Sequence, residues 1–590
     1  MPLKCLFGPS DPAYVDDNLS AARASGNCLA FNSEGNLDVM IRHEDCWQDV
    51  LARLPVGWRP DVVALFLPYA TVPDCVWNAP IPIVGLAADW HLLWHQYQFA
   101  LGRCDLVVTD NAGVAVLGQA GFSAFAANLF GCARSFFNES KSQTRDIDVL
   151  YVGSLHPAEQ RDRLPWLRRV VLAAGDRWKV RIRSAASRGE YLELLRRSRI
   201  LFNRSVRGEC NLRVFEAAAT GPLLFQEIGN REVGQYLQDG TECVFYAEDT
   251  LETLLKYYLE NEGERARIAA AAKQRSPEFS FDSLWERIVC VIEQRMEALA
   301  CRAAERSNRT ISIAMEARLW ESLNSSTRPH RAFDLERRLI DDLQRMILEQ
   351  PQARLYNMLG LALARRGQRE GAFNRTCTAE CAAKFRRAVE LRPESLLFRL
   401  NFVESLWHIG SNLEAIEECR RALNILERTS DLNEGDLCGG HFPPAFDTFR
   451  IEWERSAWRN AGDRNLEVRD KIRLLGWRLH SLMGALSNEL HHYRRAVSLR
   501  DDLWVSHAAL GRALLRSGAC REAATYLRRA HELNPFDDSL TGDLLEASRM
   551  TRDTDGECRL IAERRLMQLA AGMNAPTEIR FTQEVTKRGL

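Results

Sequence analysis

Residues 200–221 read ILFNRSVRGECNLRVFEAAATG, and this stretch decides the fold of the middle of the chain. Its first three residues form an apolar run that is typical of a buried strand. A polar loop follows, and a helix is predicted to begin near Asn211 and to end at Gly221, which precedes a proline. Because strand, loop and helix in this order form half of a βαβ unit, we expect a parallel sheet here.

Short apolar runs alternate with helical stretches on both sides of this segment. Such alternation implies parallel sheets that are covered by helices on both faces. We therefore predict two doubly wound, Rossmann-like α/β domains that meet at a cleft, over residues 1–140 and 146–300. The strands are expected at residues 5–7, 28–31, 62–67, 83–86 and 106–108 of the first domain and 148–152, 179–183, 200–203, 222–225 and 243–246 of the second.

The strand signal stops near residue 330, and a repeat takes over. An Arg-Arg-Ala motif recurs with its alanine at Ala388, Ala422, Ala496 and Ala530. The alanines are 34 residues apart within the first pair and within the last pair, which is the period of tetratricopeptide repeats. An all-α solenoid is therefore predicted. Its expected boundaries are a linker over 301–335, the repeats over 336–550 with an insertion near 430–465, and a helical tail over 551–590.

Composition excludes several classes of protein. The 590 residues include 78 Lys and Arg against 79 Asp and Glu, for a formal net charge of −1, and this balance argues against a dedicated nucleic-acid binder. The most apolar long window, residues 113–133, contains two amides and four glycines, so we interpret it as buried strand and helix rather than a membrane span. Sixteen cysteines without a signal peptide indicate reduced thiols in a cytoplasmic protein.

Polar residues gather in the loop and helix start of the opening segment. Side chains between a parallel strand and the next helix lie at the ligand-binding edge of the sheet. The helix N-terminus offers N–H groups to an anion such as phosphate, and Arg207 and Arg213 could add bidentate contacts. Glu216, in the second turn, could accept hydrogen bonds from ribose hydroxyls. The alternative is an ordinary amphipathic helix with a capping Asn211 and surface arginines, but the density of polar groups favours a ligand site.

Residues 211–221, with the later run GTECVFY at 240–246 and DVLYVGSL at 148–155, resemble the donor half of GT-B glycosyltransferases. The nearest branch is the spore-maturation (CgeB-like) one. The resemblance implies that the second α/β domain binds a nucleotide-sugar. It also implies that Gly153 and Ser154 lie near the diphosphate, that Arg213 contacts the phosphates and that Glu216 contacts the ribose. Arg207 and Asn211 of the opening segment complete the set of donor-binding candidates.

One departure from the larger retaining families concerns the spacing of two glutamates. Those families have seven residues between the pair, whereas Glu209 and Glu216 have six between them. The resemblance therefore assigns no role to Glu209 and leaves open whether transfer retains or inverts configuration.

A second group of candidates follows the strand expected at residues 83–86. Asp89 and His91 would lie at its carboxyl end, facing the cleft, so either could act as general base on an acceptor hydroxyl. The alternative role of Asp89 is a helix N-cap, and that is also the interpretation of Asp110. His91 and His95 have the spacing of metal ligands on one helix face, but no third ligand stands nearby, so no metal is expected.

The leading hypothesis is a cytoplasmic, metal-independent glycosyltransferase that moves a sugar from a nucleotide-diphosphate donor to an acceptor hydroxyl, without a further cofactor. The acceptor would be a protein or a cell-surface glycan precursor, recruited by the repeats, whose concave surface would bind a partner protein. The alternative is a non-catalytic scaffold whose repeats bind the partner while the GT-B half only binds nucleotide or is structural. A sugar-nucleotide epimerase is disfavoured, because such an enzyme has little need of a repeat tail.

Overall fold

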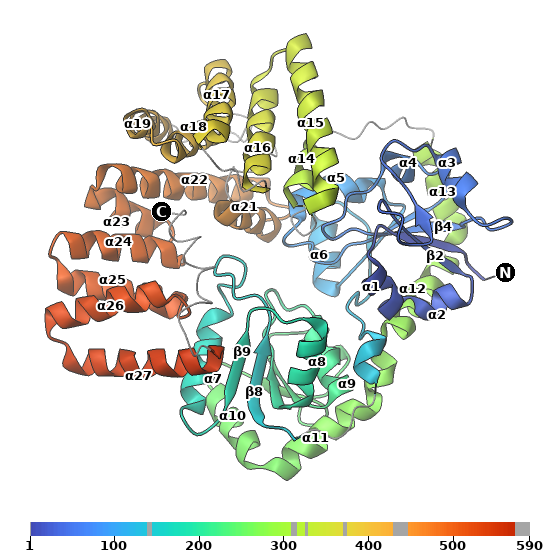
Figure 1. Ribbon diagram of the computed structural model, residues 1–590, viewed down its shortest axis with the longest axis horizontal. Coiled ribbons are helices and arrows are strands. Elements are labelled where there is room, and N and C mark those ends of the chain that lie inside the picture. The colour runs from blue at the N-terminus through green and yellow to red at the C-terminus, as the bar shows by residue number, and fades with distance from the viewer. Residues whose placement is uncertain are drawn as a thin grey trace. The chain divides into compact units, whose positions relative to one another are not determined.

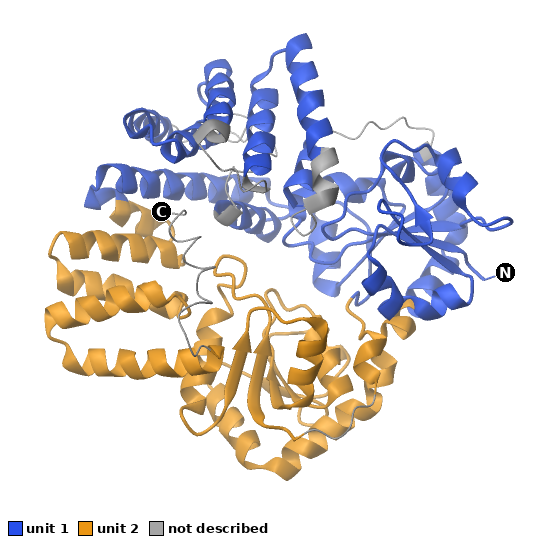
Figure 2. Cartoon of the chain, in the orientation of Figure 1, with its two compact units in different colours: residues 1–129, 286–492 blue, residues 130–285, 493–590 orange. Residues whose placement is uncertain are grey.

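The computed structural model describes residues 2–138, 144–307, 315–324, 329–369, 375–428 and 447–572. They divide into two compact units, residues 1–129 with 286–492 and residues 130–285 with 493–590 (Figure 2). Each unit combines one parallel sheet with helices from the second half of the chain. The units therefore cut across the sequential order of domains that the sequence predicts.

The first unit contains a seven-stranded, all-parallel sheet in the order β3-β2-β1-β4-β5-β6-β7. The five predicted strands are confirmed, and the short strands β3 and β7 were not predicted. The strands are β1 (Cys5–Gly8), β2 (Cys28–Asn32), β3 (Val39–Met40), β4 (Val62–Phe66), β5 (Ile83–Leu86), β6 (Leu106–Thr109) and β7 (Ala124–Ala126). The connecting helices are α1 (Pro12–Asn18), α2 (Ser20–Ala24), α3 (Trp47–Arg53), α4 (Asp74–Trp77), α5 (Trp94–Ala100) and α6 (Asn111–Gln119) (Figure 1).

The second unit contains a five-stranded parallel sheet in the order β12-β11-β10-β8-β9. All five strands predicted for this part of the chain are confirmed. They are β8 (Ile147–Val152), β9 (Val180–Arg183), β10 (Ser198–Phe202), β11 (Leu223–Glu227) and β12 (Val244–Tyr246). The helices are α7 (Leu164–Ala174), α8 (Arg188–Arg196), α9 (Leu212–Thr220), α10 (Leu251–Glu260) and α11 (Glu262–Arg275). Because β9 lies on one side of β8 and β10 on the other, the order of the strands reverses between β8 and β10, and this reversal is the topological switch point of the sheet.

Alternate side chains of this second sheet enter two separate cores. Tyr151 and Phe202 pack with α7 and α10 on one face, whereas Leu150 and Leu201 pack with α8 and α9 on the other. Burial on both faces explains the continuous apolar runs in β8, β10 and β11, whereas the edge strand β9 alternates apolar residues with arginines.

The second half of the described chain is helical. Of residues 301–335, predicted as a linker, those that the structure describes (301–307, 315–324 and 329–335) belong to helices. The helices that follow α11 are α12 (Phe281–Glu293), α13 (Met296–Ser307), α14 (Met315–Asn324), α15 (Pro329–Glu349), α16 (Ala353–Arg369), α17 (Arg375–Leu391), α18 (Leu396–His408), α19 (Asn412–Arg428), α21 (Asp447–Arg459), α22 (Arg464–Ser487), α23 (Leu490–Leu499), α24 (Trp504–Arg516), α25 (Cys520–Leu533), α26 (Asp538–Thr551) and α27 (Thr554–Ala571). None of these, nor any other helix in the described ranges, is both long and apolar enough to cross a membrane.

The four recurring alanines are buried at the expected small-residue positions. Ala388, Ala422 and Ala530 have no exposed surface and Ala496 is 2% exposed. They lie on α17, α19, α25 and α23. Of the insertion expected near 430–465, residues 430–446 lie outside the described residues, and the rest includes α21.

Helices from the second half of the chain complete the cores of both sheets. In the first unit, Ala317 of α14 and Ala457 of α21 belong to the core under the seven-stranded sheet. In the second unit, Met567 of α27 packs with the five-stranded sheet, and Arg168 of α7 forms an ion pair with Glu563 of α27. The segment predicted as a tail thus covers the second α/β domain, and residues 573–590 lie outside the described residues.

Close packing of paired helices makes Gly511 sensitive to substitution. A Cβ atom added at Gly511 on α24 would lie 2.6 Å from Cγ of Leu527 on α25. Gly511→Val is therefore expected to lower the free energy of unfolding by about 1–3 kcal/mol, the usual cost of overpacking. Urea denaturation of the full chain measures it. The control is Gly542→Ala on α26, where an added Cβ meets no atom within 4 Å, and an equal loss of stability in both variants would contradict the packing argument.

Candidate functional site

The carboxyl ends of β8 and β10 bring the predicted donor-binding residues together at the switch point. β8 ends at Val152 and continues into Gly153 and Ser154, while β10 ends one residue before Asn203. α9, whose first turn carries Arg213, begins after the loop that follows β10. Residues that are some 60 positions apart in the sequence therefore meet at one edge of the sheet, where open α/β sheets bind their ligands.

The guanidinium of Arg213 is held between the ends of the two strands. Its Nε donates to Oδ1 of Asn203 at 2.8 Å, and its Nη1 donates to the carbonyl of Val152 at 3.0 Å. The guanidinium carbon lies 5.4 Å from the centre of the Tyr151 ring. Nη2 has no hydrogen-bond partner among the described residues, so the fixed cation retains donors for an anion.

Gly153 makes room for this arrangement. A Cβ atom at this position would lie 2.6 Å from Nη1 of Arg213 and 2.9 Å from the hydroxyl of Tyr151. The loop then turns, and Oγ of Ser154 accepts a hydrogen bond from the backbone N–H of His156 at 3.2 Å. The glycine expected next to a diphosphate thus also sets the position of the arginine.

Two buried carboxylates brace the loop between β10 and α9. Glu209 accepts hydrogen bonds from the backbone N–H groups of Val206 and Arg207. Glu227, at the end of β11, accepts from the backbone N–H of Ser205 at 3.0 Å, and burial raises the pKa of Glu227 above its usual range. Glu209 therefore has a structural role in the loop that carries the half-buried Arg207.

The N-terminus of α9 has no side-chain cap. Asn211 occupies the N-cap position, but its side chain does not accept from the helix N–H groups. It exchanges hydrogen bonds of 3.2 Å with Asn203 instead. The capping role that the alternative interpretation gave Asn211 is therefore wrong, and the first-turn N–H groups face the same edge of the sheet as Arg213.

Glu216 lies one turn after Arg213 on α9 and is 6% exposed. Its Oε2 accepts a hydrogen bond of 2.7 Å from the hydroxyl of Tyr191 on α8. Burial raises the pKa of Glu216 to about 7, against the opposing effects of the Tyr191 hydrogen bond and the Arg213 charge. The predicted ribose-binding carboxylate is thus close to Arg213 and largely enclosed.

Glu216→Gln is expected to stabilise the fold at pH 8 and to change it little at pH 5. Since the pKa rises from its ordinary 4.5 to about 7 on folding, the folded chain holds a proton in this window that the unfolded chain has lost, and stability falls as pH rises from 4.5 to 7. The amide is never ionised and can still accept from Tyr191, so the gain above pH 7 is of the order of 1–3 kcal/mol.

Thermal unfolding of both forms at pH 5, 6, 7 and 8 measures this effect. The control is Glu260→Gln, which removes an exposed carboxylate of the same unit. A difference in melting temperature between wild type and Glu216→Gln that is the same at every pH would contradict the assigned pKa.

The candidates of the first unit lie differently from the prediction. Asp89 follows β5 in a turn with φ +50°, and α5 begins only at Trp94 with Leu93 as its N-cap. Asp89 is therefore not a helix N-cap, and His91, which precedes α5, does not share a helix face with His95. Asp110 is an N-cap as expected, and it accepts from the backbone N–H of Gly113 at 2.6 Å.

The two histidines near α5 are both buried. His91 is 6% exposed, with the rings of Trp90 and Trp458 packed edge-on against it at 6.0 and 6.4 Å between centres. Nδ1 of His95 lies 2.8 Å from Oε2 of Glu454 on α21. His95 thus connects the first α/β domain to the helices of the same unit, and this role is structural.

Three residues of the site were not predicted from the sequence. Asn203 holds both Arg213 and Asn211, and its position directly after an apolar strand was a usable signal. Tyr151 and Tyr191 contact Arg213 and Glu216. Their roles depend on tertiary packing between separate elements, for which the sequence has no local signal.

The segment that carries this geometry also matches a known protein family. Residues 134–288 match the glycosyl transferase-like family. The match spans the whole five-stranded sheet and includes Gly153, Asn203, Arg213 and Glu216. The chain has no significant match among curated proteins.

Several solved structures are weakly similar to the chain. TarM is 11% identical with a TM-score of 0.30, over 39% of this chain and 54% of TarM. The pneumococcal O-GlcNAc transferase GtfA, solved with UDP and GlcNAc, is 10% identical with a TM-score of 0.28, over 40% of this chain and 56% of GtfA. MamA is 10% identical with a TM-score of 0.22, over 40% of this chain and 96% of MamA. The chain thus spans about half the length of the first two proteins, and similarities at this level do not bear on its function.

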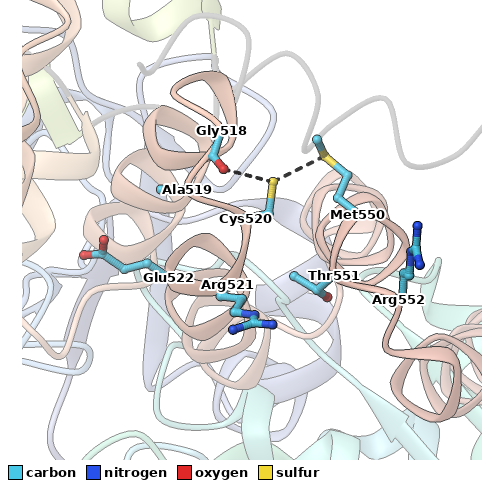
Figure 3. Close-up of a pocket in the computed structure, with 8 residues that line it drawn as sticks. All are labelled: Gly518, Ala519, Cys520, Arg521, Glu522, Met550, Thr551 and Arg552. Carbon is cyan, nitrogen blue, oxygen red and sulfur yellow. Dashed lines mark hydrogen bonds between the residues drawn. The ribbon is translucent and has the colours of Figure 1, made fainter.

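A separate hollow of about 640 Å³ lies in the helical region, where α25 begins and α26 ends (Figure 3). Sγ of Cys520 donates to the carbonyl of Gly518 at 3.5 Å and lies 3.7 Å from Sδ of Met550. The hollow thus joins the loop ends of two neighbouring helix pairs. Its lining residues are Gly518, Ala519, Cys520, Arg521, Glu522, Met550, Thr551 and Arg552.

Proposed function

We propose that the chain is a glycosyltransferase that moves a sugar from a nucleotide-diphosphate donor to an acceptor hydroxyl. The donor diphosphate would bind at the switch point of the five-stranded sheet, next to Gly153 and Ser154. Arg213, with Arg207 from the same loop, would contact phosphate oxygens. Glu216 would accept hydrogen bonds from the ribose.

The observation that carries this proposal is the fixed position of Arg213 inside the segment that matches the glycosyl transferase-like family. Asn203 and Val152 orient its guanidinium while Nη2 keeps donors for an anion. The uncapped N-terminus of α9 adds backbone N–H groups and a partial positive charge at the same edge. Both features favour the binding of a diphosphate.

The same groups would stabilise the leaving diphosphate without a metal ion. As the bond between the sugar and the diphosphate breaks, negative charge grows on the phosphate oxygens. Donors that are already oriented stabilise this charge without having to reorganise. Metal independence is therefore part of the proposal.

Asp89 remains the better candidate for the base that would accept the proton of the acceptor hydroxyl. It lies at the carboxyl end of β5, and its side chain is more exposed than that of His91. The ring of His91 is enclosed by two tryptophans, which limits its access to an acceptor.

The helical region would recruit a protein acceptor or a partner protein. Its paired helices and 34-residue spacing are typical of tetratricopeptide arrays, which bind peptides on extended surfaces. The hollow between α25 and α26 offers side chains of both charges, Arg521, Arg552 and Glu522, for such a contact.

Turnover of a nucleotide-sugar by the full chain tests the proposal. The full chain is needed because α27 completes the core of the second sheet. We expect one member of a panel of UDP-, GDP-, TDP- and CMP-sugars to release its nucleotide, faster when an acceptor is present. A chain that binds a nucleotide but turns over no donor in the presence of cell extract as acceptor source would favour the scaffold.

A further inference from the structure

α22, α23 and the turn between them bring together four side chains that can ligate metals. Glu489, His491 and His492 each offer one ligand atom, and these three atoms lie within 4.8 Å of one another. His480, from the preceding helix, places its Nδ1 3.0 Å from Nδ1 of His492. All four residues belong to the first unit, and none of them belongs to the proposed donor site.

The distances within this cluster are close to those of a tetrahedral metal site. Oε2 of Glu489 lies 3.5 Å from Nε2 of His492 and 3.8 Å from Nδ1 of His491. Two donors that are each about 2.0 Å from a zinc ion at the tetrahedral angle are about 3.3 Å apart. The two distances from Glu489 are therefore within about half an ångström of this spacing, and the ligand atoms of the two histidines lie within 4.8 Å of each other.

The cluster also combines access with a fixed ligand. The side chains of Glu489 and His491 are 51% and 69% exposed, whereas that of His492 is 10% exposed. An ion can thus reach the cluster from solvent and meet an imidazole that is held in place by His480.

We propose that Glu489, His491 and Nε2 of His492 bind a divalent transition-metal ion, with zinc as the best match and water as the fourth ligand. Two imidazoles and one carboxylate are typical donors for zinc when a position is left open to water. Hard ions such as Mg²⁺ prefer ligand sets made of oxygen, so they should compete poorly.

His480 acts in this proposal as a positioning residue. When Nδ1–H of His492 donates to Nδ1 of His480, Nε2 of His492 keeps the lone pair that a metal needs. Partners of this kind fix the tautomer and orientation of a ligating histidine, and their loss usually weakens metal binding about 10- to 100-fold.

Equilibrium dialysis of the chelator-stripped full chain against Zn²⁺ tests the site. Exposed cysteines such as Cys46 and Cys558 can also bind zinc, so the quantity to compare is the number of ions bound per chain. We expect His491→Ala and Glu489→Gln each to bind one fewer ion than wild type. The matched control is Glu286→Gln, an exposed glutamate outside the cluster, which should bind the wild-type number.

A second measurement separates positioning from ligation. His480→Ala should keep the number of ions but weaken binding about 10- to 100-fold, and His480→Gln, whose amide oxygen can accept the same hydrogen bond, should recover part of the loss. Equal stoichiometry and equal affinity in wild type, His491→Ala and Glu489→Gln would overturn the proposal and assign the bound zinc to cysteines. Donor turnover plays no part in either readout, so the outcome is independent of the proposed enzymatic function.

Discussion

Arg213→Ala is expected to weaken the binding of nucleoside diphosphates about 30-fold to a few thousand-fold. Removing one partner of a hydrogen-bonded charge pair costs about 2–5 kcal/mol, and each 1.4 kcal/mol is a factor of ten in affinity. The structure adds a reason for the upper part of this range. Asn203 and Val152 already hold the guanidinium, so little freedom is lost when it contacts phosphate.

Isothermal titration of the full chain with UDP, GDP and TDP measures this effect, with the monophosphate CMP titrated for comparison. Arg213→Lys keeps the charge but cannot reproduce both hydrogen bonds, so its affinity should lie between those of wild type and alanine variant. The control is Arg177→Ala, an exposed arginine that precedes β9 and lies at the amino end of the strands. Unchanged affinity in a folded Arg213→Ala variant would remove Arg213 from the donor site.

Arg306→Ala is expected to be the most destabilising of the substitutions considered for the first unit. Arg306 on α13 pairs with Asp105, and their side chains are only 9% and 4% exposed. The guanidinium also donates to the carbonyls of Trp77, Ala79 and Ile81. Its removal leaves a buried carboxylate and three carbonyls without these donors, and breaking a buried pair in this way costs about 3–5 kcal/mol.

Urea denaturation followed by tryptophan fluorescence checks this prediction. The control is Arg345→Ala, whose exposed side chain pairs with Asp342 on the same helix; such surface pairs contribute at most about 1 kcal/mol. Similar denaturation midpoints for Arg306→Ala and Arg345→Ala would mean that α13 does not anchor the first sheet through Arg306.

Sequence patterns predicted the strands of both sheets because parallel strands are buried on both faces. Runs such as residues 62–66 and 200–202 stand out as apolar whatever their neighbours are. β3 and β7 escaped because they have two and three residues, several of them only half-buried. The docking of α27 on the second sheet also escaped, since Met567 and its partners are hundreds of residues apart in the chain.

For the candidate site, residues next to strand ends could be predicted, and side-chain partners could not. Arg213 follows from a strand–loop–helix pattern and Gly153 from the resemblance to GT-B glycosyltransferases, and the structure brings the two together. The bond between Tyr191 and Glu216 joins two helices on one face of the sheet, and no periodicity encodes it. The helix expected to begin near Asp89 begins later, at Trp94, because residues 89–93 form a turn in which Asp89 has positive φ.

The central claim is that a nucleoside diphosphate binds between the carboxyl ends of β8 and β10. A crystal structure of the full chain with the nucleotide that titrates most tightly tests it most directly. The account predicts phosphate oxygens within hydrogen-bonding distance of Nη2 of Arg213 and of the first-turn N–H groups of α9, with the ribose near Glu216. A diphosphate bound elsewhere on the chain, with Arg213 still contacting only Asn203 and Val152, would contradict it.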